Sequence, residues 1–148
     1  MRAPEPMAQR LTAAQRTPTR LHGLRVVATP TALDLATWRP AGIALRVAGD
    51  EMLAIGSTDV DLDDPSAIIE PESAFVGWWL TPDQFATFVV PHLEWTLPMH
   101  RPSLAQGLVA GVPLKLWLEA DRILVITSSG LAHEAVVRLF GPAPGEAS

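Results

Sequence analysis

The chain has 148 residues, of which 48% are hydrophobic and 18% charged, and this composition is typical of one globular domain. No apolar run reaches the roughly 18 residues that a transmembrane helix needs. It contains no cysteine, which excludes disulfide bonds, thiolate metal sites and cysteine nucleophiles. The net charge of −5 is the sum of +4 in residues 1–25 and −9 in the rest of the chain. Because the acidic part repels phosphate backbones, we do not expect nucleic acid as a partner.

The two ends of the chain lack the apolar periodicity of folded elements. Residues 1–20 are rich in Pro, Ala, Arg, Gln and Thr and are interpreted as a flexible basic arm, and residues 141–148 as a flexible tail. We therefore expect a single folded domain over residues 21–140. No hydrophobic block follows the basic N-terminal residues, so we expect no secretory signal and a cytoplasmic protein without a membrane partner. Ten arginines against one lysine are typical of a GC-rich bacterial coding sequence.

The first part of the predicted domain is rich in strand signals. Thr29 and Pro30 provide the N-cap and first-turn proline of a helix, and Pro71 separates two strands because proline cannot donate to a ladder. The elements expected are a strand at Leu21–Ala28, a short helix from Pro30 to about Trp38, a hairpin of Gly42–Val47 with Met52–Ile55, and strands at Ala67–Glu70 and Ser73–Leu80.

The second part begins with a strong helix start. Thr81, Pro82 and Gln84 combine a capping threonine, a first-turn proline and a reciprocal glutamine. Ser103–Val112 stays ambiguous because its glycines lower helix propensity. The closing elements are a hairpin of Pro113–Glu119 with Ile123–Thr127 and a helix opened by Ser128-Ser129-Gly130. The pattern predicts an α+β fold with an antiparallel or mixed sheet and two to four short helices on one face, ending in a β-hairpin and a terminal helix.

An acidic loop at residues 59–70 has the spacing of calcium ligands. Asp59, Asp61, Asp63 and Glu70 occupy positions 1, 3, 5 and 12 of an EF-hand-like loop. Position 6 is Asp64 in place of the glycine that permits the sharp turn, and the flanks are not helical. A solvated acidic loop is therefore the favoured interpretation, with calcium or small-molecule binding as the alternative.

Signals for catalysis are sparse. The four histidines (His22, His92, His100 and His133) do not have metal-ligand spacing, and no phosphate-binding loop is present, so we expect no cofactor. A small-molecule pocket near His92, His100 and Arg101 stays open. So does an enzyme with dispersed acid and base residues, such as Asp83, Glu94 and His100, because catalytic groups need spatial rather than sequential proximity. The sequence favours a role outside catalysis and leaves the question of enzyme activity open.

The tryptophans point to an interface. Trp78 and Trp79 are neighbours in a predicted strand, so their side chains face opposite sides of the sheet. Trp117 shares a strand face with Lys115, whereas the leucines at 114, 116 and 118 face the core. Apolar side chains on faces expected to be wet are typical of protein interfaces. We take Trp78, Trp79, Trp117 and Lys115 as the candidate interface, with a sheet covered inside the domain or an aromatic ligand platform as alternatives.

Residues 101–140 also resemble a known family. The segment Ala110-Gly111-Val112-Pro113-Leu114-Lys115-Leu116-Trp117, the hairpin turn at Asp121-Arg122 and the following helix are similar to the closing segment of aminomethyltransferase-like domains and of the gamma subunit of heterotetrameric sarcosine oxidase. The resemblance implies a non-catalytic partner of larger flavin- and folate-binding chains. The leading hypothesis is an interaction module, a small subunit or adaptor that docks on a larger protein, with an oxidoreductase complex as one candidate. Self-association into a homo-oligomer is the alternative.

Overall fold

The computed structural model describes residues 10–142 and has the α+β fold with antiparallel sheets and short helices that the sequence predicts. Contacts divide the chain into two compact units, where the sequence suggested a single domain over residues 21–140. Unit 1 contains residues 10–19 and 76–142, and unit 2 is Arg20–Phe75. The amino-acid composition does not reveal this division, because the chain passes from one unit to the other at two points that both lie within or next to strands. The predicted tail at 143–148 and residues 1–9 of the predicted arm lie outside the described residues.

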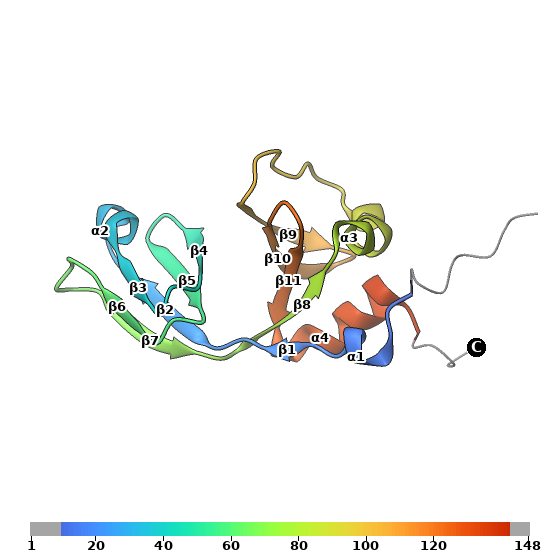
Figure 1. Cartoon of the computed structure of the whole chain (residues 1–148), viewed down its shortest axis with the longest axis horizontal. Helices are drawn as coiled ribbons and strands as arrows, with labels where there is room; N and C mark the ends of the chain where they lie inside the picture. Colours follow the sequence, from blue (N-terminus) through green and yellow to red (C-terminus); the bar gives the residue numbers. More distant parts are fainter. Residues whose placement is uncertain (1–9, 143–148) are drawn as a thin grey trace, which may run out of the picture. The chain divides into compact units, whose positions relative to one another are not determined.

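Unit 2 is built on a four-stranded antiparallel sheet with strand order β4-β5-β2-β7 (Figure 1). Its elements are β2 (Gly23–Val27), α2 (Pro30–Leu35), β3 (Thr37–Arg39), β4 (Ile43–Ala48), β5 (Glu51–Ile55), β6 (Asp59–Asp61) and β7 (Ile68–Glu72). Leu24 and Val26 of β2 pair with Ala54 and Met52 of β5, and these four residues belong to the apolar core that α2 covers. Thr29 caps α2 as predicted, since its hydroxyl accepts from the amide of Ala32.

Unit 1 is built on a five-stranded sheet with strand order β1-β8-β11-β10-β9, and its helices lie on one face of that sheet (Figure 1). Its elements are α1 (Ala13–Arg16), β1 (Thr19–Arg20, which spans the division), β8 (Phe75–Leu80), α3 (Pro82–Phe88), η2 (Val90–His92), β9 (Ser103–Val109), β10 (Val112–Leu118), β11 (Ile123–Ser128), η3 (Ser129–Leu131), α4 (Ala132–Ala135) and η4 (Val136–Phe140). The helices and the sheet enclose one apolar core, to which Leu116, Val125 and Phe85 contribute.

Two strand assignments depend on tertiary context. Ser103–Val109 forms β9, the edge strand next to β10, so the ambiguous segment is a strand rather than a helix. Pro71 does not separate two strands but lies inside β7. A proline is tolerated there because β7 is at the edge of its sheet and pairs with β2 on one side only. The capping box at Thr81 and Gln84 forms as predicted and begins α3.

Residues 10–20 differ from the flexible arm that the composition suggested. Leu11 is 2% exposed and belongs to the core of unit 1. Arg16, at the end of α1, is buried, and its Nη1 donates to the carbonyl of Phe140 at 2.9 Å, with a second donation from Nη2 to Gly141. These bonds satisfy carbonyls at the end of the terminal helix, which would otherwise lack a donor. Low hydrophobicity concealed the segment because Leu11 is its one buried apolar residue, and its other contacts are hydrogen bonds.

Candidate interaction surface

The tight turn between β10 and β11 holds two oppositely charged side chains together. The amide of Glu119 donates to the carbonyl of Arg122 at 3.0 Å, which closes the turn. Nε of Arg122 donates to Oε1 of Glu119 at 2.8 Å. The second carboxylate oxygen, Oε2, accepts from the indole Nε1 of Trp117, also at 2.8 Å. Glu119 therefore uses both oxygens to fix the side chains on either side of it.

Trp79 is connected to the same group through Arg122. It lies on β8, the strand adjacent to β11, and its side chain is 42% exposed. The guanidinium carbon of Arg122 is 3.8 Å from the centroid of the Trp79 ring, the geometry of a cation–π contact. We call Trp79, Trp117, Glu119 and Arg122 the Trp79–Trp117 cluster. Its members come from β8, from β10 and from the turn that follows β10, all in unit 1.

The electrostatics of this cluster keep Glu119 ionised. The hydrogen bond from Arg122 has the largest effect and lowers the pKa of the Glu119 carboxyl below its usual value. Burial opposes it, and the hydrogen bond from Trp117 and the charge of Arg122 add smaller effects that lower the pKa. A carboxylate held in its charged form is a poor general acid. The arrangement orients aromatic and cationic groups at a surface.

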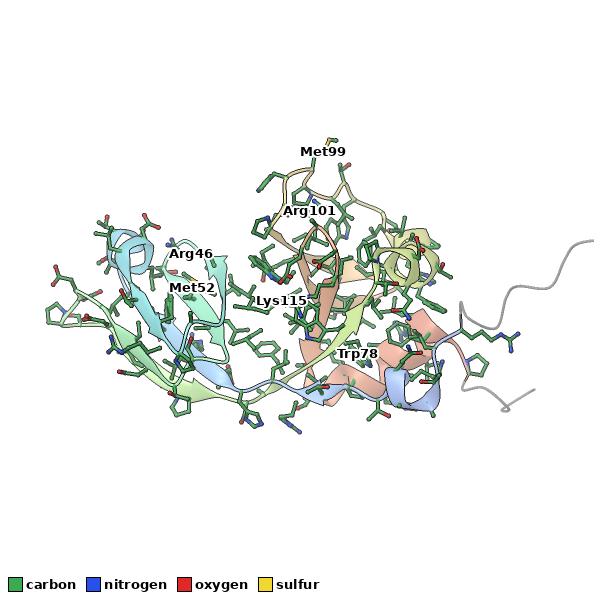
Figure 2. The ribbon with its side chains drawn as sticks, in the orientation of Figure 1. Arg46, Met52, Trp78, Met99, Arg101 and Lys115 are labelled. Atoms are coloured by element: carbon green, nitrogen blue, oxygen red, sulfur yellow. The ribbon has the colours of Figure 1, made fainter. Side chains whose placement is uncertain are left out.

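Of the other two predicted interface residues, Trp78 lies in the core, and Lys115 lies on β10 two residues before Trp117. Trp78 is 2% exposed and sits among the core side chains of unit 1 (Figure 2). Its ring makes an edge contact with Phe140 at 5.7 Å between centroids, and its Nε1 donates to the carbonyl of Arg16 at 2.9 Å. Trp78 is therefore a core residue, because the N-terminal segment and the terminal helix cover it. Lys115 is partly buried on β10, where its Nζ donates to Oε1 of Gln106 at 2.8 Å.

The acidic loop is not assembled into a cation site. Within residues 10–142, no group of three or more His, Cys, Asp or Glu side chains is placed to hold a metal ion. Asp59 pairs with Arg39 at 2.7 Å, and Glu70, on β7, lies 3.8 Å from Arg25. The hydrogen bond from Arg39 lowers the pKa of the Asp59 carboxyl. The predicted calcium set of Asp59, Asp61, Asp63 and Glu70 fails because β6 and β7 separate its members and arginines neutralise two of them.

The dispersed acid and base residues do not form a catalytic group. Asp83 is in the first turn of α3, whereas Glu94 and His100 belong to the loop after η2, and all three are exposed. No hydrogen bond or ion pair connects any two of these three side chains. Nothing in this part of the described chain therefore corresponds to an oriented acid–base pair.

Unit 2 contains an open pocket of about 440 Å³ at one end of its sheet. His22, Gly56, Ser57 and Glu72 are among its lining residues. Much of its polar lining is already bonded internally: Ser57 donates its hydroxyl proton to the carbonyl of Pro40 at 2.8 Å, and the amide of Gly56 donates to the carbonyl of His22 at 2.8 Å. The pocket does not include the predicted His92–Arg101 region.

Glu119 and Arg122 are the cluster residues that the sequence did not single out. Their signal was an acid and a base three residues apart across a hairpin turn, which is common on exposed turns and seldom marks a site. Only the structure brings this pair between two tryptophans from different strands.

In the described part of the chain, no helix is long and apolar enough to cross a membrane.

The fold and the cluster define a two-unit α+β protein with a preformed Trp–Arg surface. No protein-family model and no curated protein matches the chain. Among solved structures it is similar to a chain of the heterotetrameric sarcosine oxidase from Corynebacterium sp. U-96 in complex with pyrrole 2-carboxylate, with a TM-score of 0.62 and 13% identity. The likeness covers 95% of this chain and 92% of that chain. It confirms the resemblance suggested by residues 101–140 and extends it to nearly the whole fold.

Proposed function

We propose that this chain is a non-catalytic subunit of a heteromeric oxidoreductase complex. The observation that carries the proposal is the fold shared with a chain of heterotetrameric sarcosine oxidase over 95% of this chain and 92% of that one. Coverage of both chains to this extent supports a whole subunit of the same architecture, in contrast to a domain shared by unrelated proteins. Function does not follow from fold alone, so the surface chemistry has to agree with it.

The docking surface in this proposal is the Trp79–Trp117 cluster. Tryptophan and arginine are the residue types that most often dominate the binding energy of protein interfaces. Trp79 is 42% exposed, and Arg122 and Glu119 hold the cluster in one arrangement through bonds of 2.8 Å. Side chains that are ordered before binding lose less conformational entropy on association, which favours affinity. A surface that combines a half-exposed aromatic ring with a cation fits a protein partner.

The non-catalytic role agrees with the chemistry of the acids in the described residues. The carboxyls with clearly shifted pKa values, Glu119 and Asp59, are both shifted downward by arginine. A carboxyl that acts as a general acid near neutral pH needs a pKa raised toward that pH. In this proposal the redox chemistry belongs to larger subunits, this chain carries no cofactor of its own, and the complex is cytoplasmic and bacterial, as the sequence suggested.

Purification of the tagged chain from its source organism tests the proposal. We expect a stoichiometric second polypeptide larger than the chain's 15.9 kDa, with a flavin absorption band in the complex. The Trp79→Ala variant should lose this polypeptide, whereas Leu35→Ala, which truncates an exposed apolar residue of unit 2, should retain it. A clean monomer contradicts the proposal. A complex that contains only copies of this chain supports the homo-oligomer instead.

A further inference from the structure

The loop between η2 and β9, residues 93–102, has no helix or strand but is firmly attached at its base. Trp95 Nε1 donates to the carbonyl of Leu108 on β9 at 2.8 Å. The Trp95 ring lies directly over Gly107, where an added Cβ would be 2.8 Å from Cε2 of the indole. Leu93 and Leu97 pack against the core of unit 1 together with Trp95. Three apolar side chains and one backbone contact therefore fix the first half of the loop.

The tip of the same loop is closed by an arginine. Nη1 of Arg101 donates to the carbonyls of Pro98 and His100, at 2.6 and 2.9 Å. Between these anchors the side chain of Met99 is 95% exposed, at the outermost part of the loop (Figure 2). An unbranched apolar side chain in this position contributes nothing to the core. The fold thus places a large hydrophobic group in water on a loop that its own contacts hold in shape.

The charged side chain closest in sequence to Met99 is that of Arg101. The loop also contains Glu94, at its base and five residues before Met99, so the positive charge of the loop lies at its tip, whereas the net charge of the chain is −5. Arg101 uses Nη1 for the loop carbonyls, so its charge is displayed beside Met99 at the exposed tip. The complement of this tip is an apolar cavity with carboxylates at its edge.

We infer that Met99 is an anchor residue, which the loop inserts into an apolar pocket edged by carboxylates on the larger partner subunit. The inference rests on the proposed function, since it assumes that the partner exists, and it adds a second contact to the Trp79–Trp117 cluster. Methionine adapts its shape to irregular pockets, and a loop already held in shape pays little entropy on insertion. Arg101 fixes the orientation of the tip through the acidic edge.

The experiment measures the affinity of tip variants of the full chain for the larger subunit isolated from the purified complex. Met99→Asp is expected to weaken binding of the isolated larger subunit by about 30-fold or more, whereas Met99→Leu stays within about 3-fold because the apolar volume is kept. Arg101→Glu should weaken binding by about 10-fold at low salt, and high salt should reduce the difference. Leu35→Asp is the matched control, an exposed apolar residue outside unit 1, and is expected to bind like wild type.

A photoreactive methionine analogue at position 99 identifies the occupant directly. We expect its cross-link to map to one segment of the larger subunit that contains apolar residues with aspartate or glutamate close by. A complex that forms normally with Met99→Asp, or cross-links that map to copies of this chain, would overturn the inference and leave the proposed function standing. Recovery of no larger subunit by the wild-type chain would overturn both.

Discussion

The guanidinium group of Arg122 lies 3.8 Å above the ring centroid of Trp79, and the same group donates from Nε to Glu119 at 2.8 Å. One side chain therefore connects an exposed tryptophan on β8 to the turn between β10 and β11. An exposed cation–π contact of this kind stabilises by about 0.5–1 kcal/mol, and more once water is excluded. The contact is weak for folding and would become stronger if a partner excluded water from it, as the proposed docking surface requires.

The neighbouring tryptophans Trp78 and Trp79 should separate folding from binding. Trp78→Ala removes a ring buried against Phe140, so we expect a loss of about 3–5 kcal/mol in the free energy of unfolding. Trp79→Ala removes a half-exposed ring and should cost about 1 kcal/mol or less. Urea titration followed by circular dichroism measures both. If Trp79→Ala unfolds the protein as Trp78→Ala does, Trp79 is a structural residue and the assigned surface is wrong.

The ion pair in the Trp79–Trp117 cluster should respond to acid. The pKa of Glu119 in the folded chain is lowered from 4.5, chiefly by the hydrogen bond from Arg122, so the folded state favours the ionised carboxyl. Its contribution to stability is fully present above about pH 4.5 and is lost as the pH falls through the lower, folded-state pKa. Glu119→Gln removes the titrating group but retains an acceptor for Trp117.

The measurement is the difference in unfolding free energy between wild type and Glu119→Gln as a function of pH. We expect wild type to be the more stable protein near neutral pH and the difference to shrink below about pH 4.5. This subtraction removes the contributions of other carboxyls, including Asp59 with Arg39. A difference that stays constant down to the acid transition would show that Arg122 and Glu119 do not interact in solution.

The packing of the Trp95 ring on Gly107 can be tested by adding one methyl group at position 107 and measuring the free energy of unfolding. Gly107→Ala would place a Cβ 2.8 Å from the indole, so we expect the ring to be displaced and the protein to lose about 1–3 kcal/mol. Gly130→Ala is the control, because no atom lies within 4 Å of its Cβ position, and it should change stability by less than about 0.5 kcal/mol. Equal stabilities of the two variants would mean that the loop base is not packed as described.

The N-terminal segment should contribute to the stability of unit 1 through one buried arginine. Arg16→Met leaves the carbonyl of Phe140 without its donor, so we expect a loss of about 1–3 kcal/mol. Arg20→Met removes an exposed arginine that also donates to a carbonyl, that of Ser73, and should cost less than about 0.5 kcal/mol. Thermal unfolding of the two variants checks the difference. An Arg16→Met variant as stable as wild type would show that the hydrogen bonds of this arginine do not hold the segment in place.

Sequence patterns predicted the elements whose signals are local. The capping box of Thr81 and Gln84 and the hairpin of β10 with β11 are set by neighbours a few residues apart, and both form where expected. Trp78 was assigned to an interface because alternation in a strand shows that two faces are apolar but not what covers them. Its cover comes from Arg16 and Phe140, which are 62 residues away on each side. Such long-range contacts leave no periodic trace in the sequence.

The candidate site was predicted in part for the same reason. The sequence indicates Trp79 and Trp117 because they are large aromatic residues on strand faces that the alternation pattern predicts to be solvent-exposed. The sequence does not indicate Glu119 and Arg122, because this pair contacts Trp79 only through the pairing of β8 with β11 in the sheet. The calcium pattern failed in the opposite way: its spacing is correct in the sequence, but Arg39 and Arg25 bind two of the four carboxylates in the fold.

The dissociation constant of the chain from the larger subunit of its native complex tests the central claim most directly. Wild type and Trp79→Ala are compared with the same purified subunit, after both have been shown to be folded. We expect Trp79→Ala to bind at least about 30-fold more weakly, as for a central aromatic anchor. Equal affinities would contradict the proposal that Trp79 is part of the docking surface, and a chain that binds no larger subunit would contradict the proposal that this protein is a subunit of a complex.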